Sequence, residues 1–136
     1  MTDYSKFKKS LEHLKDQWKN HQTLDPSQSK LIKEAVAESV IQRFETCYDC
    51  LWKILKRYLS ESCGVPEMPN SPKPIFRIAF ENHVLSSPVE TWIIYANLRI
   101  GTSHDYNGEK AQEALRSMED FVRDATLLYQ TMTREV

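Results

Sequence analysis

The sequence has 136 residues, a formal net charge of −1, 40% hydrophobic residues and 27% charged residues. This composition is typical of a globular protein, and it excludes both a disordered chain and a globally basic nucleic-acid binder. The apolar runs are too short to span a bilayer and we find no secretion signal, so we expect a cytoplasmic protein. Binding to RNA would need a local basic patch made by folding or dimerisation, because phosphate contacts supply much of such affinity.

The first predicted helix covers the N-terminal segment. Its apolar residues alternate in three- and four-residue steps, which places them on one helical face. These residues are Tyr4, Phe7, Leu11, Leu14 and Trp18. The second helix is expected to begin at Asp25-Pro26, with Asp25 as the N-cap and Pro26 at the first position, where its missing N–H costs nothing.

The second helix is predicted to be the longest element of the protein. No glycine or proline interrupts the helical pattern over residues 27–62, which would extend about 54 Å at the rise of an α-helix. Gly64 and Pro66 are expected to end it. The proline-rich stretch 65–72 is then predicted to be a surface loop.

Three shorter helices are predicted after this loop. One covers 75–83, the next begins with a capping box at 87–90 and weakens at Gly101, and the last begins near Glu109. No alternating strand pattern competes with them. We therefore expect an all-α fold in a single domain over residues 1–136. It would be an up-and-down bundle of about five antiparallel helices around one long central helix.

A short polar segment follows where the helical pattern lapses. Arg99 carries a permanent charge that can bind phosphate oxygens, and His104 can transfer a proton near neutral pH. Asp105 or Tyr106 could orient the imidazole or contact a ligand. A structural interpretation competes with this one, in which Asp105 and Asn107 cap the last helix, and spacing alone favours it.

Two segments of the chain carry recognisable motifs. The first is VIQRFE at 40–45, which continues with LWK at 51–53 and LKRYL at 55–59. The second is the Arg-x4-His-x-Tyr spacing formed by Arg99, His104 and Tyr106. Both resemble signatures of the nucleotidyltransferase substrate-binding protein family, a HepT-like group within the HEPN superfamily of helical bundles. The resemblance covers nearly the whole chain, in the expected order.

The resemblance implies a helical substrate-binding partner subunit of a minimal nucleotidyltransferase, in a two-component system of the toxin–antitoxin type. Such a protein would form a homodimer and dock the nucleotidyltransferase encoded nearby. It would bind a nucleotide or RNA phosphate through the second motif, with no cofactor and no metal. The reactive positions would be Arg99, His104 and Tyr106. The substrate contacts would be Arg43, Ser103 and Asp105.

Two alternatives stay open beside this binding interpretation. In the first, the chain is a HEPN toxin, a metal-independent endoribonuclease that the nucleotidyltransferase silences by attaching AMP to Tyr106. The resemblance then gives Arg99 the stabilisation of the scissile phosphate and His104 general acid–base catalysis while a ribose 2′-OH attacks. Ile100 favours binding over cleavage, because HEPN ribonucleases usually carry a polar residue there. In the second, the chain is a non-catalytic scaffold bundle.

The remaining candidate residues are better explained by packing. Cys47 and Cys50 lie three residues apart on the long predicted helix, but a metal site needs two further ligands and no second cysteine pair exists. Buried free thiols are the better account, since cysteine is among the most buried residue types. The three tryptophans fall on apolar stripes and are predicted to anchor the core or an interface.

Overall fold

The computed structural model describes residues 2–105 and 107–134. The described residues form helices and no strand, which confirms the predicted all-α fold. The helices are α1 (Ser5–Thr23), α2 (Lys30–Glu61), α3 (Pro72–Glu81), α4 (Val89–His104), α5 (Glu109–Arg116) and α6 (Met118–Thr133). The last predicted helix is therefore divided into α5 and α6, which meet at Ser117.

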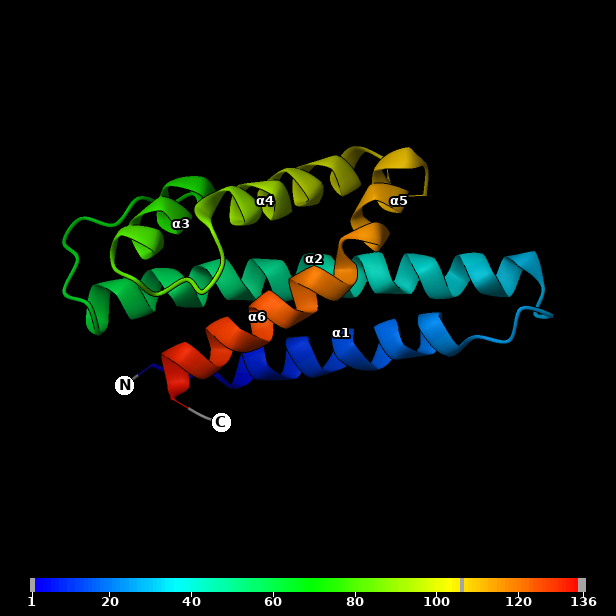
Figure 1. The fold of residues 1–136 in the computed structure, drawn as a ribbon, viewed down its shortest axis with the longest axis horizontal. Coiled ribbons are helices and arrows are strands. Elements are labelled where there is room, and N and C mark those ends of the chain that lie inside the picture. The colour runs from blue at the N-terminus through cyan, green and yellow to red at the C-terminus, as the bar shows by residue number, and fades with distance from the viewer. Residues whose placement is uncertain (1, 106, 135–136) are drawn as a thin grey trace.

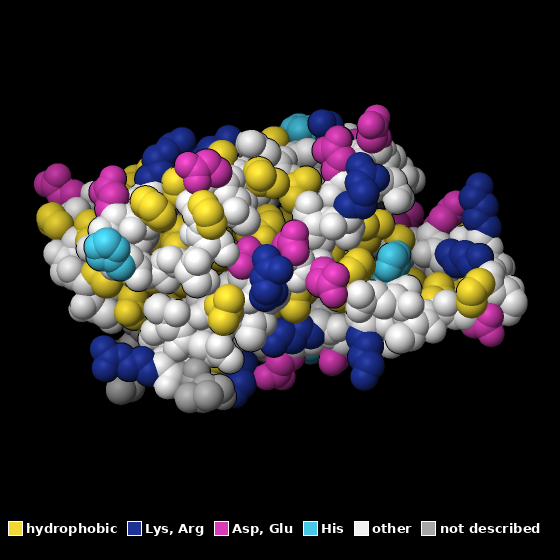
Figure 2. Space-filling view, in the orientation of Figure 1, with side chains coloured by type: hydrophobic (Ala, Val, Ile, Leu, Met, Phe, Trp, Pro, Cys, Tyr) yellow, Lys and Arg dark blue, Asp and Glu magenta, His cyan; other side chains and the backbone are white. Residues whose placement is uncertain are grey.

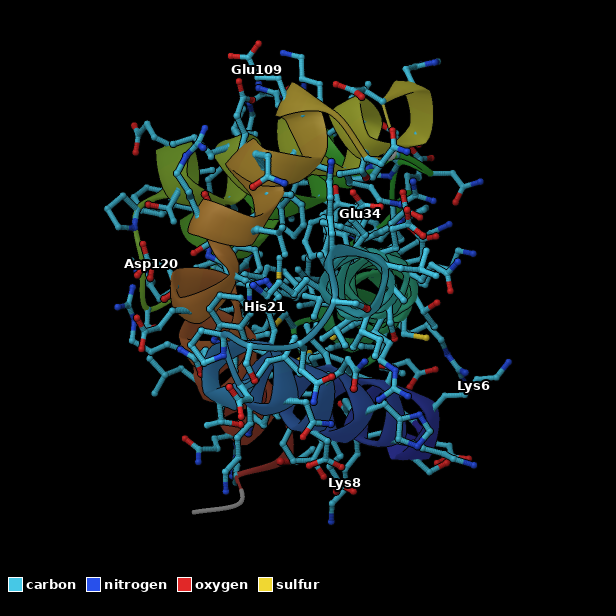
Figure 3. All side chains as sticks on the ribbon, turned by 90° about the vertical axis from the view of Figure 1, so that its right-hand side faces the viewer. Lys6, Lys8, His21, Glu34, Glu109 and Asp120 are labelled. Atoms are coloured by element: carbon cyan, nitrogen blue, oxygen red, sulfur yellow. The ribbon has the colours of Figure 1, made fainter. Side chains whose placement is uncertain are left out.

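The long helix α2 is the centre of the bundle. It contacts each of the other five helices in the described part of the chain. Helix α1 runs along one side of α2, α3 and α4 lie on the opposite side, and α6 crosses in front of α1 and α2 (Figure 1). The end-on view shows the same arrangement, with α2 between α1 below and α4 above (Figure 3). This order confirms the predicted central helix.

A chain of aromatic contacts fixes α4 against the core. Phe44 of α2 packs edge-on against Phe121 of α6 at 4.9 Å between ring centroids, and Phe121 packs against Tyr95 of α4 at 5.1 Å. Trp92 then contacts Tyr95 and Phe76 of α3, each at 5.3 Å. All five rings are buried, and aromatic pairs in such geometry are each worth about 0.5–1.5 kcal/mol beyond area burial. The start of α4 is thereby held in one position.

The predicted start of α2 was wrong by four residues. The helix begins at Lys30 after Ser29, whose Oγ accepts a hydrogen bond from the Ile32 N–H at 3.2 Å. The Asp25 carboxylate accepts the Ser27 N–H at 2.9 Å within a turn that precedes the helix. Asp25 can serve such a turn as well as a helix cap, because its short side chain reaches the backbone two residues on.

The predicted capping box at the start of α4 does not form. The helix begins at Val89 after Pro88, without a side-chain cap. The Ser87 hydroxyl instead donates to Asp124 Oδ1 on α6 at 2.6 Å, because that carboxylate is buried and needs donors. The expected weakening at Gly101 was also wrong, since α4 continues through this residue to His104.

Cys47 is packed inside the bundle, whereas Cys50 is partly exposed. Burial raises the pKa of the Cys47 thiol to about 12, so this residue is a neutral core group. Among the described residues, no three His, Cys, Asp or Glu side chains are grouped as metal ligands would be. Within the same residues, no helix has both the length and the apolar composition needed to cross a bilayer.

Candidate functional site

Arg99 lies on the side of α4 that faces α2, where two carboxylates hold its guanidinium. Its Nε and Nη2 donate to the two oxygens of Asp49 at 3.3 and 3.2 Å. Its Nη1 donates to Glu45 Oε2 at 3.0 Å. Glu45 and Asp49 are four residues apart on α2 and therefore share one helical face. The contact is an ion-pair cluster that links α2 and α4, and the forked geometry suits an arginine better than a lysine.

Two hydroxyls of α4 complete this cluster. Ser103 Oγ accepts from Arg99 Nη1 at 2.7 Å, and Thr102 Oγ1 donates to Glu45 Oε2 at 2.7 Å. Burial alone would lower the pKa of Arg99, but the hydrogen bonds and charge of Asp49 and the charge of Glu45 raise it. The guanidinium therefore keeps its positive charge in a position where 26% of the side chain is exposed.

The hydrogen bonds of Arg99 limit what it can bind. A guanidinium has five N–H groups, and acceptors within the described chain occupy four of those on Arg99. A phosphate that approaches this residue must use the remaining N–H or replace one of the present acceptors. Ser103 is the neutral one of these acceptors, so it is the contact that costs least to exchange.

His104 is the last residue of α4, and its side chain is exposed. The His104 imidazole forms no hydrogen bond or ion pair with the other described residues. Five residues along an α-helix correspond to a rotation of about 140° and a rise of about 7.5 Å. Because Arg99 faces α2, His104 points to a different side of α4. A single chain therefore does not bring these two motif residues together.

Asp105 and the residues after it connect α4 to α5. The Asp105 carboxylate accepts the Lys110 N–H at 2.9 Å, so it caps the start of α5 as the structural interpretation expects. Gly108 lies directly against this carboxylate, and a Cβ there would be 2.2 Å from Asp105 Oδ1. Tyr106, the third residue of the motif, lies outside the described residues.

Arg43 is placed away from the rest of the predicted site. Its Nη1 donates to the backbone carbonyl of His13 in α1 at 2.8 Å. Two residues of separation turn an α-helix by about 200°, so Arg43 and Glu45 lie on opposite sides of α2. Within one chain, Arg43 contacts α1 and the cluster around Arg99 does not include it.

Sequence reasoning missed the two carboxylates of the cluster. Glu45 is the last residue of the VIQRFE motif, and Asp49 follows one helical turn later on the same face. A pair of acids four residues apart, set among the apolar residues of the middle of α2, was the available signal, because such a pair needs a cation or solvent. Arg99, an isolated cation on a largely apolar helix, was the corresponding partner.

A match to a protein-family model confirms the family resemblance that the two motifs suggested. The family described as nucleotidyltransferase substrate binding protein like matches residues 2–134. The chain belongs to this family. It is also similar to a protein of Haemophilus influenzae named probable ribonuclease HepT. The two are 26% identical over 107 residues, which cover 77% of this chain and 73% of that relative.

Solved structures share the fold of this family member. The Haemophilus influenzae protein HI0074, described as having the fold of a substrate binding domain of a nucleotidyltransferase, superposes with a TM-score of 0.85. It is 20% identical, over 98% of this chain and all of that one. A tri-AMPylated HEPN toxin of Shewanella oneidensis, in complex with an MNT antitoxin, superposes with a TM-score of 0.70. It is 17% identical, over 99% of this chain and all of that one.

Proposed function

We propose that this family member is a ribonuclease toxin whose partner is a minimal nucleotidyltransferase antitoxin. The similarity to probable ribonuclease HepT supports the proposal, because it extends over most of both chains. The sequence placed the binding interpretation first and the ribonuclease second, and the comparisons favour the ribonuclease. The Shewanella oneidensis toxin adds that the same fold occurs AMPylated beside an antitoxin.

The observation that carries the proposed chemistry is the presence of a fixed, charged Arg99 and an exposed His104 imidazole within the last turns of α4. In metal-independent cleavage, a ribose 2′-OH attacks the adjacent phosphorus and the bond to the 5′ oxygen breaks. The products are a 2′,3′-cyclic phosphate and a free 5′-OH. His104 suits the removal of the 2′-OH proton or the protonation of the leaving oxygen. Arg99 suits stabilisation of the charge on the phosphate.

We further propose that the active unit is a homodimer formed through the outer face of α4. Ile94 and Ile100, which lie about 120° apart on the two edges of this face, are 54% and 53% exposed, although α4 also buries Trp92 and Tyr95 on its inner side. A helix that is apolar on both sides is expected to be covered on both. Because a single chain does not bring His104 and Arg99 together, we propose that His104 of one protomer reaches the exposed part of the Arg99 side chain of its partner.

Growth and cleavage assays test the ribonuclease directly. Expression of the chain alone is expected to arrest growth, and the purified protein is expected to cut RNA in the presence of a chelator. His104→Asn should abolish both effects. His83→Asn is the matched control, because His83 is also exposed and asparagine tolerates its positive φ of 59°. A wild-type protein that neither arrests growth nor cuts RNA would contradict the proposal.

The binding interpretation is the second candidate, and two observations favour it. Ile100 stands beside Arg99 where the ribonucleases usually have a polar residue, and four of the five Arg99 N–H groups are already engaged. This candidate predicts a stable complex with the nucleotidyltransferase and no RNA cleavage. AMP transfer to Tyr106 stays a prediction in either case. Mass spectrometry of the chain after co-expression with the nucleotidyltransferase tests it.

A further inference from the structure

We propose that a groove beside Arg99 binds one nucleotide of a single-stranded RNA, with its base against Trp52 and its phosphate at Lys73 and Arg77. The inference rests on the proposed ribonuclease function and adds where the substrate lies. The groove runs between α2, the first half of α3 and the second half of α4. Its volume of about 560 Å³ falls within the range of about 300–1,000 Å³ that is usual for ligand sites.

The wall formed by α2 is aromatic. Trp52 lines the groove and is only partly buried, while the buried Tyr48 closes the groove from below. The Lys53 ammonium lies over the Trp52 ring, 5.8 Å from its centroid, and adds a cation beside this wall. Bases of single-stranded RNA stack on such aromatic side chains, and this stacking tolerates every base.

The wall formed by α3 is basic. Lys73 and Arg77 line the groove, and neither forms an ion pair or hydrogen bond with another described residue. Basic side chains are visible along the edge of the molecule above α3 (Figure 2). The charged residues of the lining are three cations, including Arg99, against the single carboxylate of Asp49. Because Asp49 and Glu45 balance the charge of Arg99, Lys73 and Arg77 supply the unbalanced positive charge of this groove, in a chain whose net charge is −1.

The position of the groove beside Arg99 favours RNA over other anionic ligands. Arg99 and Ser103 line the end of the groove on α4, so a bound nucleotide continues directly to the proposed scissile phosphate. Aromatic and basic walls that face each other are the combination used to bind single strands. A duplex would not fit, because its bases are stacked on each other and are not available to Trp52.

Fluorescence anisotropy with a fluorescein-labelled single-stranded oligoribonucleotide tests the groove. The probe carries 2′-O-methyl groups, so binding is measured without cleavage. The double variant Lys73→Glu/Arg77→Glu is expected to weaken binding by about tenfold or more and to lower the salt dependence by about two phosphate contacts. The matched control is Lys8→Glu/Lys15→Glu, which makes the same change in charge on α1, next to α6, and should leave binding within about twofold. Lys8 points away from the bundle on the side opposite α4 (Figure 3).

The stacking contact has its own variants. Trp52→Leu keeps an apolar side chain but removes the stacking surface, and it should weaken binding by about tenfold. Trp52→Phe keeps an aromatic ring and should retain most of the affinity. Circular dichroism checks that both variants fold, because Trp52 also packs against the core. Equal binding by the two variants would contradict a stacked base.

Several outcomes would contradict the proposal that this groove binds RNA. They are a wild type that does not bind the probe, a Lys73/Arg77 variant that binds like the wild type, and equal losses in both charge-reversal variants. A Lys73/Arg77 variant that keeps RNA affinity but no longer co-purifies with the nucleotidyltransferase would make the groove a protein-docking surface instead. Because the probe cannot be cleaved, binding is measured independently of ribonuclease activity. A protein that binds RNA in the groove but has no ribonuclease activity would contradict only the proposed function. Cleavage that does not depend on Lys73 and Arg77 would contradict only the proposed binding of RNA in the groove.

Discussion

Arg99 and Glu45 connect the two motifs of the family at the level of single residues. Glu45 belongs to the VIQRFE part of the first motif and Arg99 is the first residue of the second, and their side chains meet at 3.0 Å. These two residues are 54 positions apart in the chain, and their contact makes the two motifs parts of one cluster. The cluster also explains why Arg99 holds a defined position although it lies near the end of its helix.

Removal of the Glu45 charge should destabilise the protein. Glu45→Gln keeps the shape of the side chain but removes the ion pair with Arg99, and only 18% of the Glu45 side chain is exposed. We expect the free energy of unfolding in urea to fall by about 1–2 kcal/mol. The control is Glu34→Gln, which breaks the exposed pair between Lys30 and Glu34 and should change stability by less than about 0.5 kcal/mol. Equal effects of the two changes would show that the cluster contributes no more than a surface pair.

The sequence located part of this site and could not give its geometry. The polar segment that begins at Arg99 was predicted as the candidate site through its resemblance to the second family signature, because spacing alone favoured a helix cap. The partners of Arg99 were not predictable from local pattern, because Glu45 and Asp49 lie about 50 residues away in the chain. The direction of the His104 side chain depends on whether Gly101 is helical. The sequence predicted that the helix weakens at Gly101, whereas α4 continues through it to His104.

Two glycines, one inside α4 and one directly before α5, have different structural roles. Gly101 lies inside α4, and a Cβ there would meet the Lys110 side chain at 3.4 Å, an ordinary contact distance. Gly101→Ala should therefore raise the free energy of unfolding by about 0.5–1 kcal/mol, because alanine loses less backbone entropy in a helix. Gly108→Ala should lower it, because the added Cβ would collide with the Asp105 carboxylate that caps α5. Urea unfolding of both variants measures the change in the free energy of unfolding. A change in the same direction for both would contradict the different roles of the two glycines.

Helix boundaries were predicted less well than the helices themselves. Apolar periodicity extends over several turns and identified every helical segment, although it did not detect the division at Ser117. A boundary depends on a few short polar side chains, and each has more than one available partner. Ser87 is the clearest case, because the buried carboxylate of Asp124 takes its hydroxyl away from the helix start.

At the scale of the whole molecule, the apolar pattern of α2 predicted the architecture. A long helix with apolar residues around much of its surface must be surrounded, and α2 contacts all five other helices of the described chain. The same reasoning applies to α4, but within one chain it is covered on one side only. Apolar side chains lie exposed over α4 on the face seen in Figure 2. This difference between α2 and α4 is the physical basis for the proposed homodimer.

The homodimer can be tested by a single charge on the outer face of α4. Ile94→Glu should convert a dimer into a monomer in light scattering coupled to size-exclusion chromatography, because it buries a carboxylate in the apolar contact. Leu31→Glu is the control, since Leu31 is a 76% exposed apolar residue at the far end of α2. A monomeric wild type, or a dimer that survives Ile94→Glu, would contradict pairing through α4.

The homodimer also predicts complementation between two inactive variants. If each site takes Arg99 from one protomer and His104 from its partner, a mixed dimer of Arg99→Ala and His104→Asn contains one intact site. Random mixing makes half of the dimers mixed, so roughly a quarter of the wild-type cleavage rate should return when the two variants are refolded together. Neither variant alone should cut RNA. Recovery requires a shared site, because a site confined to one protomer would lack either the arginine or the imidazole in every chain of the mixture.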